Sequence, residues 1–154
     1  MTVRQIRVAP HSVLSSPCEP VEQVTNGLRR LVADMIETMY AAPGVGLAAP
    51  QVGEGLRLFV FDAHDGLGAR HLINPRIVSS SGRGIRQEGC LSVPGKFWPI
   101  SRPNVVVVTG TDLDGNALTI KGAGLRARVI LHEYDHLDGR LLTSRLPTPV
   151  RVGV

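Results

Sequence analysis

The sequence predicts an α+β domain in which mostly antiparallel strands pack around one central helix. Two amphipathic helical patterns lie towards opposite ends of the chain, and the segments that favour strands lie between them. The 17 glycines and 11 prolines are spread as turn signals, which suits many short elements rather than a helical bundle. Strands and helices do not alternate, which argues against a doubly wound parallel sheet. No repeat or linker divides the 154 residues, so we expect a single domain over residues 1–154.

The N-terminal helix is expected to begin after Thr25, whose hydroxyl can cap a helix. Apolar residues then recur at the spacing of one helix face, and Pro43-Gly44 ends the pattern. These apolar positions are Leu28, Leu31, Val32, Met35, Ile36 and Met39. A second helix is expected over residues 125–137, with Gly139 as its terminator. No helical pattern fits the final segment, TPVRVGV, so no C-terminal helix is expected beyond the second one.

Four segments between the helices favour strands because they are rich in β-branched and aromatic residues. They cover residues 56–62, 71–78, 104–111 and 117–121. Asp114-Gly115 is a hairpin signal between the last two of these segments, so we expect those two strands to pair antiparallel.

Composition excludes several classes of protein. Hydrophobic residues make up 43% of the chain, which excludes wholesale disorder, and no apolar run approaches the roughly 18–20 residues of a membrane span. The first ten residues, MTVRQIRVAP, lack the apolar core of a signal peptide, and the chain has only two cysteines. We therefore expect a reducing, cytoplasmic location. The net charge of +4 is scattered and aromatic residues make up 4%, which argues against a dedicated nucleic-acid surface.

The strongest chemical signal is the segment His132-Glu133-Tyr134-Asp135-His136 within the second predicted helix. Histidines four residues apart lie one turn apart on the same helix face, so His132 and His136 can share one metal ion. Glu133 is placed to exchange protons with a water on that metal. A catalytic site needs a third protein ligand. The 18 residues after His136 contain no histidine or glutamate, and Asp138 points away, so the third ligand must lie upstream.

Three upstream positions are candidates for the third ligand. Cys90 lies in a turn-like segment, where a neighbouring backbone amide could also take part in chemistry. Cys18 lies in a proline-bracketed loop that suits structural packing, and His64 and His71 flank a glycine-containing loop that suits the surface. Spacing alone favours Cys90 only moderately; its thiolate would be a good ligand for zinc or ferrous iron.

A third feature is the segment Gly44–Gln51, which directly follows the first predicted helix. Its glycines and alanines would let an extended peptide approach the backbone closely. Gln51 is a neutral amide donor that could stabilise an oxyanion. Taken alone, the segment is more typical of an ordinary glycine-rich helix exit than of a binding site.

Together these three segments resemble the peptide deformylase family. Its signatures are a GxGLAAxQ segment, an EGCLS segment and an HExDH helix, in that order. This chain has GVGLAAPQ at Gly44–Gln51, EGCLS at Glu88–Ser92 and HEYDH at His132–His136. The resemblance extends over roughly residues 6–146, nearly the whole chain. It implies removal of the N-formyl group from nascent chains that begin with formylmethionine, with release of formate.

The resemblance also implies roles for individual residues. The family's metal ligands correspond to Cys90, His132 and His136. Its general acid/base corresponds to Glu133, and its two oxyanion donors correspond to Gln51 and the backbone N–H of Leu91. Gly46 falls on a backbone position that pairs with the substrate, and the methionine side chain needs an apolar pocket. The expected substrate-binding residues are Val45, Gly46, Glu88, Gly89, Leu125 and Val129.

The implied cofactor is one divalent metal ion. Ferrous iron is the expected ion, and zinc, nickel and cobalt suit the same ligands. The expected partners are formyl-methionyl peptides of nascent chains. The charge of +4 is compatible with proximity to the ribosome. We expect a monomer that does not bind membranes.

Two departures from the family pattern and two alternative functions remain open. Leu131 stands where many members carry glutamine, and the chain resembles the branches without a C-terminal helix. Arg102 and Asp135 are either supports for the ligand helix or ordinary surface charges. The first alternative function is a deformylase-like protein that binds peptide N-termini with weak or altered activity. The second is a metallopeptidase, which the missing downstream ligand disfavours.

Overall fold

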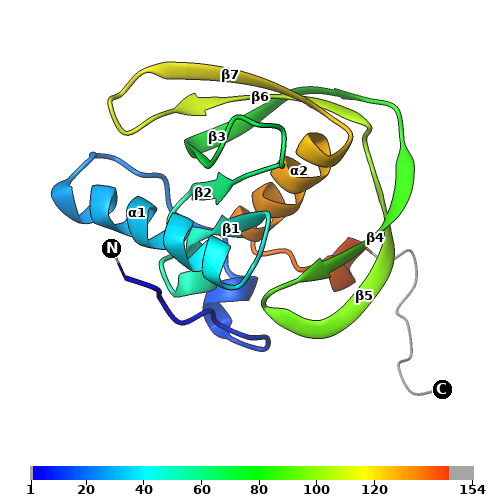
Figure 1. The fold of residues 1–154 in the computed structure, drawn as a ribbon, viewed down its shortest axis with the longest axis horizontal. Coiled ribbons are helices and arrows are strands. Elements are labelled where there is room, and N and C mark those ends of the chain that lie inside the picture. Colours follow the sequence, from blue (N-terminus) through cyan, green and yellow to red (C-terminus); the bar gives the residue numbers. More distant parts are fainter. Residues whose placement is uncertain (1, 146–154) are drawn as a thin grey trace.

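The computed structural model describes residues 2–145 and shows two helices and two antiparallel sheets (Figure 1). Helix α1 covers Asn26–Ala41 and helix α2 covers Leu125–Leu137. The strands are β1 (Gly46–Ala48), β2 (Leu58–Phe61), β3 (Arg70–Ser81), β4 (Gly84–Cys90), β5 (Val93–Arg102), β6 (Val105–Thr111) and β7 (Ala117–Ala123). Three short 3₁₀ turns are η1 (Ser12–Ser15), η2 (Ala49–Val52) and η3 (Leu142–Arg145). The α+β class predicted from the sequence is confirmed.

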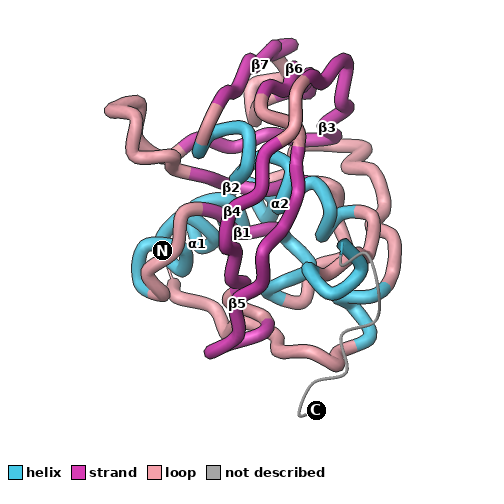
Figure 2. The backbone as a smooth tube through the Cα atoms, turned by 90° about the vertical axis from the view of Figure 1, so that its right-hand side faces the viewer, coloured by secondary structure: helices cyan, strands magenta, loops and turns pink. Residues whose placement is uncertain are grey.

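Strands β1, β2, β3, β6 and β7 form one sheet in that order, with every neighbouring pair antiparallel. Strands β4 and β5 form a separate two-stranded ribbon that lies beside α2 in Figure 2. Helix α2 therefore lies between the larger sheet and the ribbon (Figure 1). This arrangement gives α2 one face for the hydrophobic core and another for the ribbon.

Strand β2 separates two hydrophobic cores because both of its faces are buried. Phe59 and Phe61 pack with α2 and the far strands of the sheet, and their ring centroids lie 5.8 Å apart. Leu58 and Val60 point to the opposite face and pack against α1. Side chains alternate between the faces of a strand, so the four residues of β2 contribute two to each core.

The ends of both helices have local causes. The Leu28 amide donates to the Thr25 hydroxyl at 3.1 Å, which caps α1 as the sequence predicts. Helix α2 begins after Gly124, with a φ of +58°, and Gly139 follows it with a φ of +73°. A Cβ on Gly139 would lie 2.9 Å from the backbone of Ser15, so the chain needs glycine here for two reasons.

Every helix and strand that the sequence predicted is present, but three further strands were not predicted. Both helices and the four predicted strand segments are present as α1, α2, β2, β3, β6 and β7. The missed strands are β1, β4 and β5. The expectation that residues 87–92 form a turn-like segment was wrong in part, because residues 87–90 belong to strand β4 and only Leu91 and Ser92 form the turn. The expectation of no C-terminal helix concerns residues 146–154, which lie outside the described residues. Neither helix in the described part of the chain is long and apolar enough to cross a membrane.

Candidate active site

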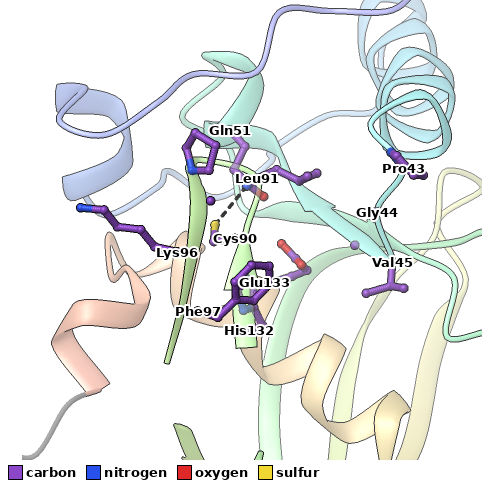
Figure 3. Close-up of a pocket in the computed structure, with 14 residues that line it drawn as sticks. Pro43, Gly44, Val45, Gln51, Cys90, Leu91, Lys96, Phe97, His132 and Glu133 are labelled. Atoms are coloured by element: carbon purple, nitrogen blue, oxygen red, sulfur yellow. Dashed lines mark hydrogen bonds between the residues drawn. The ribbon is translucent and has the colours of Figure 1, made fainter. Parts of the chain in front are cut away.

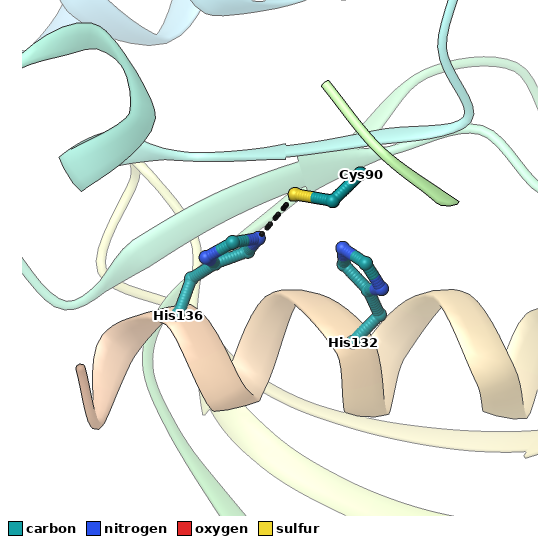
Figure 4. A group of neighbouring side chains, drawn as sticks. All are labelled: Cys90, His132 and His136. Carbon is teal, nitrogen blue, oxygen red and sulfur yellow. Dashed lines mark hydrogen bonds between the residues drawn. The ribbon is translucent and has the colours of Figure 1, made fainter. Parts of the chain in front are cut away.

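Helix α2 and the end of strand β4 bring together three side chains that can bind a metal (Figure 4). The rings of His132 and His136 lie one turn apart, with centroids separated by 5.0 Å. The Cys90 Sγ lies 3.3 Å from His136 Nε2, and the ligand atoms of the three residues all lie within 4.8 Å of one another. One thiolate and two imidazoles form a donor set that suits zinc or ferrous iron. Three protein ligands also leave a coordination position open for chemistry.

The other candidates for the third ligand have different surroundings. Cys18 is buried in the core between the sheet and α2, and its backbone amide donates to the Leu137 carbonyl. Burial raises the pKa of the Cys18 thiol to about 11, so it stays protonated. The His71 ring accepts a hydrogen bond from the Leu113 amide at 3.0 Å. His64 lies in an exposed loop. Among the described residues, the structure brings Cys90 to the histidine pair.

Glu88 fixes the orientation of His132. Its Oε1 lies 3.0 Å from His132 Nδ1, so the opposite nitrogen, Nε2, is directed towards the thiol of Cys90. Glu88 is held in turn by two hydrogen bonds from Arg102, at 2.7 and 3.0 Å. Arg102 also donates to Asp135 on α2 at 3.0 Å. Arg102 and Asp135 are therefore buried supports of the site, not surface charges.

Arg128 is a second support of Glu88. Its Nη1 donates to the Glu88 carboxylate and to the Ile100 carbonyl, and its Nη2 donates to the Gly84 carbonyl at 2.7 Å. One guanidinium thus connects α2 with both strands of the ribbon. Sequence reasoning missed this residue. The signal was its position four residues before His132, which places both side chains on one helix face.

Burial and neighbouring charges shift the pKa values of the groups around the ligands. Burial raises the pKa of Glu88, but hydrogen bonds from His132 and Arg102 outweigh it and lower the pKa to about 2. Burial lowers the pKa of His132, but Glu133, Cys90 and Glu88 raise it to about 10. Burial lowers the pKa of His136 well below its usual value, which leaves a free lone pair for a metal. A bound metal would displace the second proton of His132 while Nδ1 keeps its bond to Glu88.

Glu133, Cys90 and His132 line a cavity of about 430 Å³ (Figure 3). The Oε1 atom of Glu133 is buried and has no hydrogen-bond partner in the described structure. Burial raises the pKa of Glu133 to about 7, which suits a group that accepts and returns a proton near neutral pH. A Cβ on Gly46 would lie 2.4 Å from Glu133 Oε2, so glycine at this position makes room for the carboxylate. The cavity is lined by Pro43, Gly44, Val45, Gly46, Gln51, Gly89, Cys90, Leu91, Pro94, Gly95, Lys96, Phe97, His132 and Glu133.

The side-chain amide of Gln51 is held with its nitrogen towards Cys90. Its Oε1 accepts from the Ala48 amide at 2.9 Å, so its Nε2 is free to donate in the other direction. That nitrogen lies 3.6 Å from Cys90 Sγ and 3.2 Å from Ser92 Oγ. Gln51 is buried, and its amide group is therefore held as a donor beside the cavity. Ser92 is a supporting residue that sequence reasoning did not single out.

The structure places the six predicted substrate-binding residues in different surroundings. Val45, Gly46 and Gly89 line the cavity. Glu88 lies behind it, in the ion pairs with Arg102 and Arg128. Val129 is buried in the core between the sheet and α2. Leu125 is 49% exposed at the start of α2, beside a separate hollow.

Comparisons with known proteins agree with this geometry. Residues 3–151 match the family model described as "Polypeptide deformylase". The chain is 45% identical to peptide deformylase 1 of Clostridium perfringens, over 92% of this chain and 96% of that one. It is 48% identical to the peptide deformylase of Clostridium botulinum, over 94% and 97% respectively. The crystal structure of a peptide deformylase from Legionella pneumophila superimposes with a TM-score of 0.91 and 42% identity, over 94% of this chain and 86% of that one.

Proposed function

The chain belongs to the polypeptide deformylase family and removes the N-formyl group from nascent polypeptides, and we propose that Glu133, Gln51 and the Leu91 amide carry out the chemistry. One observation carries the assignment of roles. Cys90 and His132 line one cavity with Glu133, whose buried Oε1 has no hydrogen-bond partner among the described residues, and the ligand atom of His136 lies within 4.8 Å of those of Cys90 and His132. That cavity is also lined by the segment that precedes η2 and by the end of the ribbon.

Enzymes of this family depend on a metal, and the ligands present fit one. Cys90, His132 and His136 would hold it, and ferrous iron is the ion that we propose, with zinc, nickel or cobalt able to replace it. When bound, the metal supplies a positive charge that makes a coordinated water more acidic and polarises the formyl carbonyl.

Glu133 moves the proton in the proposed reaction. Its buried Oε1, which has no other partner among the described residues, accepts a proton from the water as the water oxygen bonds to the formyl carbon. Glu133 then returns the proton to the departing amine nitrogen. The C–N bond of the formamide breaks, and the products are formate and a peptide with a free N-terminus.

Two donors stabilise the charge that grows on the formyl oxygen. Gln51 offers its Nε2, which the bond from the Ala48 amide to its Oε1 keeps turned towards Cys90. Leu91 offers its backbone N–H at the wall of the cavity. Each such donor is worth roughly 2.7–4 kcal/mol in the transition state when it is held in place beforehand.

The substrate peptide is proposed to extend along the edge of the larger sheet. Strand β1 is an edge strand that pairs only with β2 in the sheet order. Gly46 opens this edge beside Glu133, and Gly89 lines the same cavity. Val45 lies at the cavity and contributes an apolar surface for the methionine side chain. Leu125 and Val129 do not line this cavity, so they could contact the methionine side chain only if helix α2 or its packing moved when the peptide binds.

We propose that the protein acts as a monomer with a single catalytic domain over residues 1–154, in the cytoplasm. The net charge of +4 favours encounters with the ribosome, where formylated chains emerge.

Formate release from three matched peptides tests the function. Protein loaded anaerobically with iron or nickel is incubated with formyl-Met-Ala-Ser, acetyl-Met-Ala-Ser and Met-Ala-Ser. We expect release of formate from the formylated peptide and no cleavage of the other two. Tight binding without hydrolysis would instead favour a peptide-binding protein with altered activity. Cleavage between amino acids would favour a metallopeptidase.

A further inference from the structure

The outer face of the ribbon exposes a large aromatic side chain at the mouth of the cavity. Phe97 is 68% exposed, and it lines the cavity together with Cys90 and Glu133. Figure 3 draws it among the residues that line this cavity. A large apolar side chain left in water is informative when it adjoins a binding site, because burying it on binding is favourable.

The position of the ring is fixed by the register of the ribbon. Phe97 pairs with Gly89, and a Cβ on that glycine would lie 2.5 Å from Phe97 Cε1. The missing side chain therefore lets the ring lie across the backbone next to Cys90. An aromatic ring with few rotatable bonds, packed on a glycine, loses little conformational entropy when a ligand contacts it.

One face of the ribbon packs against α2, and the other is exposed. Glu88, Ile100 and Arg102 belong to the face that packs against α2 and supports the ligands. Ile85 and Phe97 belong to the opposite face, since the pairs 85–101, 87–99 and 89–97 alternate with the inward pairs. Ile85 is 70% exposed but does not line the cavity, so it serves as an exposed apolar control on the same face of the ribbon.

We propose that Phe97 is a specificity-determining residue that favours formylated peptides with a large apolar side chain directly after formylmethionine. The inference rests on the proposed function, because it assumes a peptide in the cavity. Side chains of an extended peptide alternate, so the second side chain points away from the methionine pocket. Phe97 offers that side chain an apolar surface at the mouth. Lys96 also lines the cavity, but Figure 3 shows its side chain directed away from the other labelled residues.

Three amidated peptides and three variants test this inference. The peptides are formyl-Met-Phe-Ser, formyl-Met-Ser-Phe and formyl-Met-Ser-Ser, and the variants are Phe97→Ala, Phe97→Leu and Ile85→Ala. For the first peptide we expect Phe97→Ala to lower kcat/KM about five- to tenfold, mainly through KM, because the contact exists before the transition state. This corresponds to about 1–1.4 kcal/mol. The other two peptides should change less than about twofold.

The conservative variant and the control sharpen the test. Phe97→Leu keeps an apolar side chain and should retain most of the preference, and Ile85→Ala should leave all three peptides unchanged. Equal losses on the three peptides, or a preference that survives in Phe97→Ala, would overturn the inference. Failure of the proposed function looks different, since wild-type protein would then release no formate. Dissociation constants of the same peptides with nickel-loaded protein would in that case measure the same preference.

Discussion

The Glu133 side chain combines burial with an unpartnered oxygen, an arrangement that is costly unless it serves a purpose. Replacing Glu133 with glutamine keeps the shape beside Gly46 but removes the proton acceptor. We expect the variant to bind metal as the wild type does and to lose at least about 100-fold in kcat. Metal content by atomic spectroscopy and formate release under saturating peptide measure the two effects. A variant with more than a tenth of the wild-type kcat would refute the role given to Glu133.

The Glu88 carboxylate is the point where three cationic or proton-donating groups meet: Arg102, Arg128 and His132. In Glu88→Gln the neutral amide cannot accept from all of them, and the two guanidinium groups lose a buried counter-ion. We expect the affinity for metal to fall roughly 10- to 100-fold, as is usual when the partner of a ligating histidine is lost. Competition with a chelator measures this affinity. Glu54→Gln, in a surface ion pair with Arg4, is the matched control and should leave it unchanged.

The helix α1 depends on its first capped turn. Thr25→Ala removes the acceptor for the Leu28 amide, so we expect a loss of about 1 kcal/mol in the free energy of unfolding. Thr25→Ser retains the hydroxyl and should lose much less. Denaturant unfolding of both variants, with formate release as a second readout, checks the prediction. A drop in kcat/KM in Thr25→Ala at temperatures where it is fully folded would show that α1 also influences the site.

The elements that sequence reasoning predicted are those whose side chains follow a simple apolar period. Helix α1 buries one stripe of apolar residues, and β2 buries both faces, so each leaves a clear pattern. The ribbon does not. Strand β4 buries Cys90 alone, and its inward Glu88 and outward Ile85 reverse the usual polarity of the two faces. An internal ion-pair network and an exposed binding face together hide the strand from a hydrophobicity pattern.

The part of the candidate site that could be predicted from the sequence is the part whose residues lie close together along the chain. His132, Glu133 and His136 lie within one turn and a half of a helix, so their common face follows from helix geometry. Cys90 joins them from a different sheet, and residue spacing alone favoured it only moderately over Cys18. The support from Arg128 depends on the distance between α2 and the ribbon, which no local pattern encodes.

At the scale of the whole molecule, the N-terminal segment connects α1 with the back of the site. The Thr2 amide and the Arg4 guanidinium both donate to Asp34 on α1, at 2.8 and 3.0 Å. Further along, the Arg7 amide donates to the Gln51 carbonyl and the Ala9 amide to the Ser92 carbonyl. The segment thus joins the helix, η2 and the turn of the ribbon. Loss of these hydrogen bonds would therefore loosen the backbone at Gln51 and at the turn that follows Cys90.

This connection should weaken in acid. Burial raises the pKa of Asp34, but the hydrogen bonds from Thr2 and Arg4 outweigh it, so the folded pKa lies below the usual value of 3.8. A lowered folded pKa gives stability that is complete above the unfolded pKa and is lost as the pH falls through the folded pKa. We therefore expect wild type to be more stable than Asp34→Asn near neutral pH, with a difference that shrinks below about pH 4. Denaturant unfolding of the two proteins across this range measures the difference. A constant difference would show that Asp34 does not contribute through its charge.

The three ligands differ in how far apart they lie along the chain, and this affects how the protein would lose its metal. The histidine pair is preformed within one helix, whereas Cys90 lies 46 residues before His136 and belongs to the ribbon. A local opening that detaches the ribbon from α2 would leave two ligands in place and remove the third, without melting either core. The amount of metal that the protein retains should therefore report whether the ribbon is still packed against α2. During storage or mild heating, activity should decline before the circular dichroism of the helices changes.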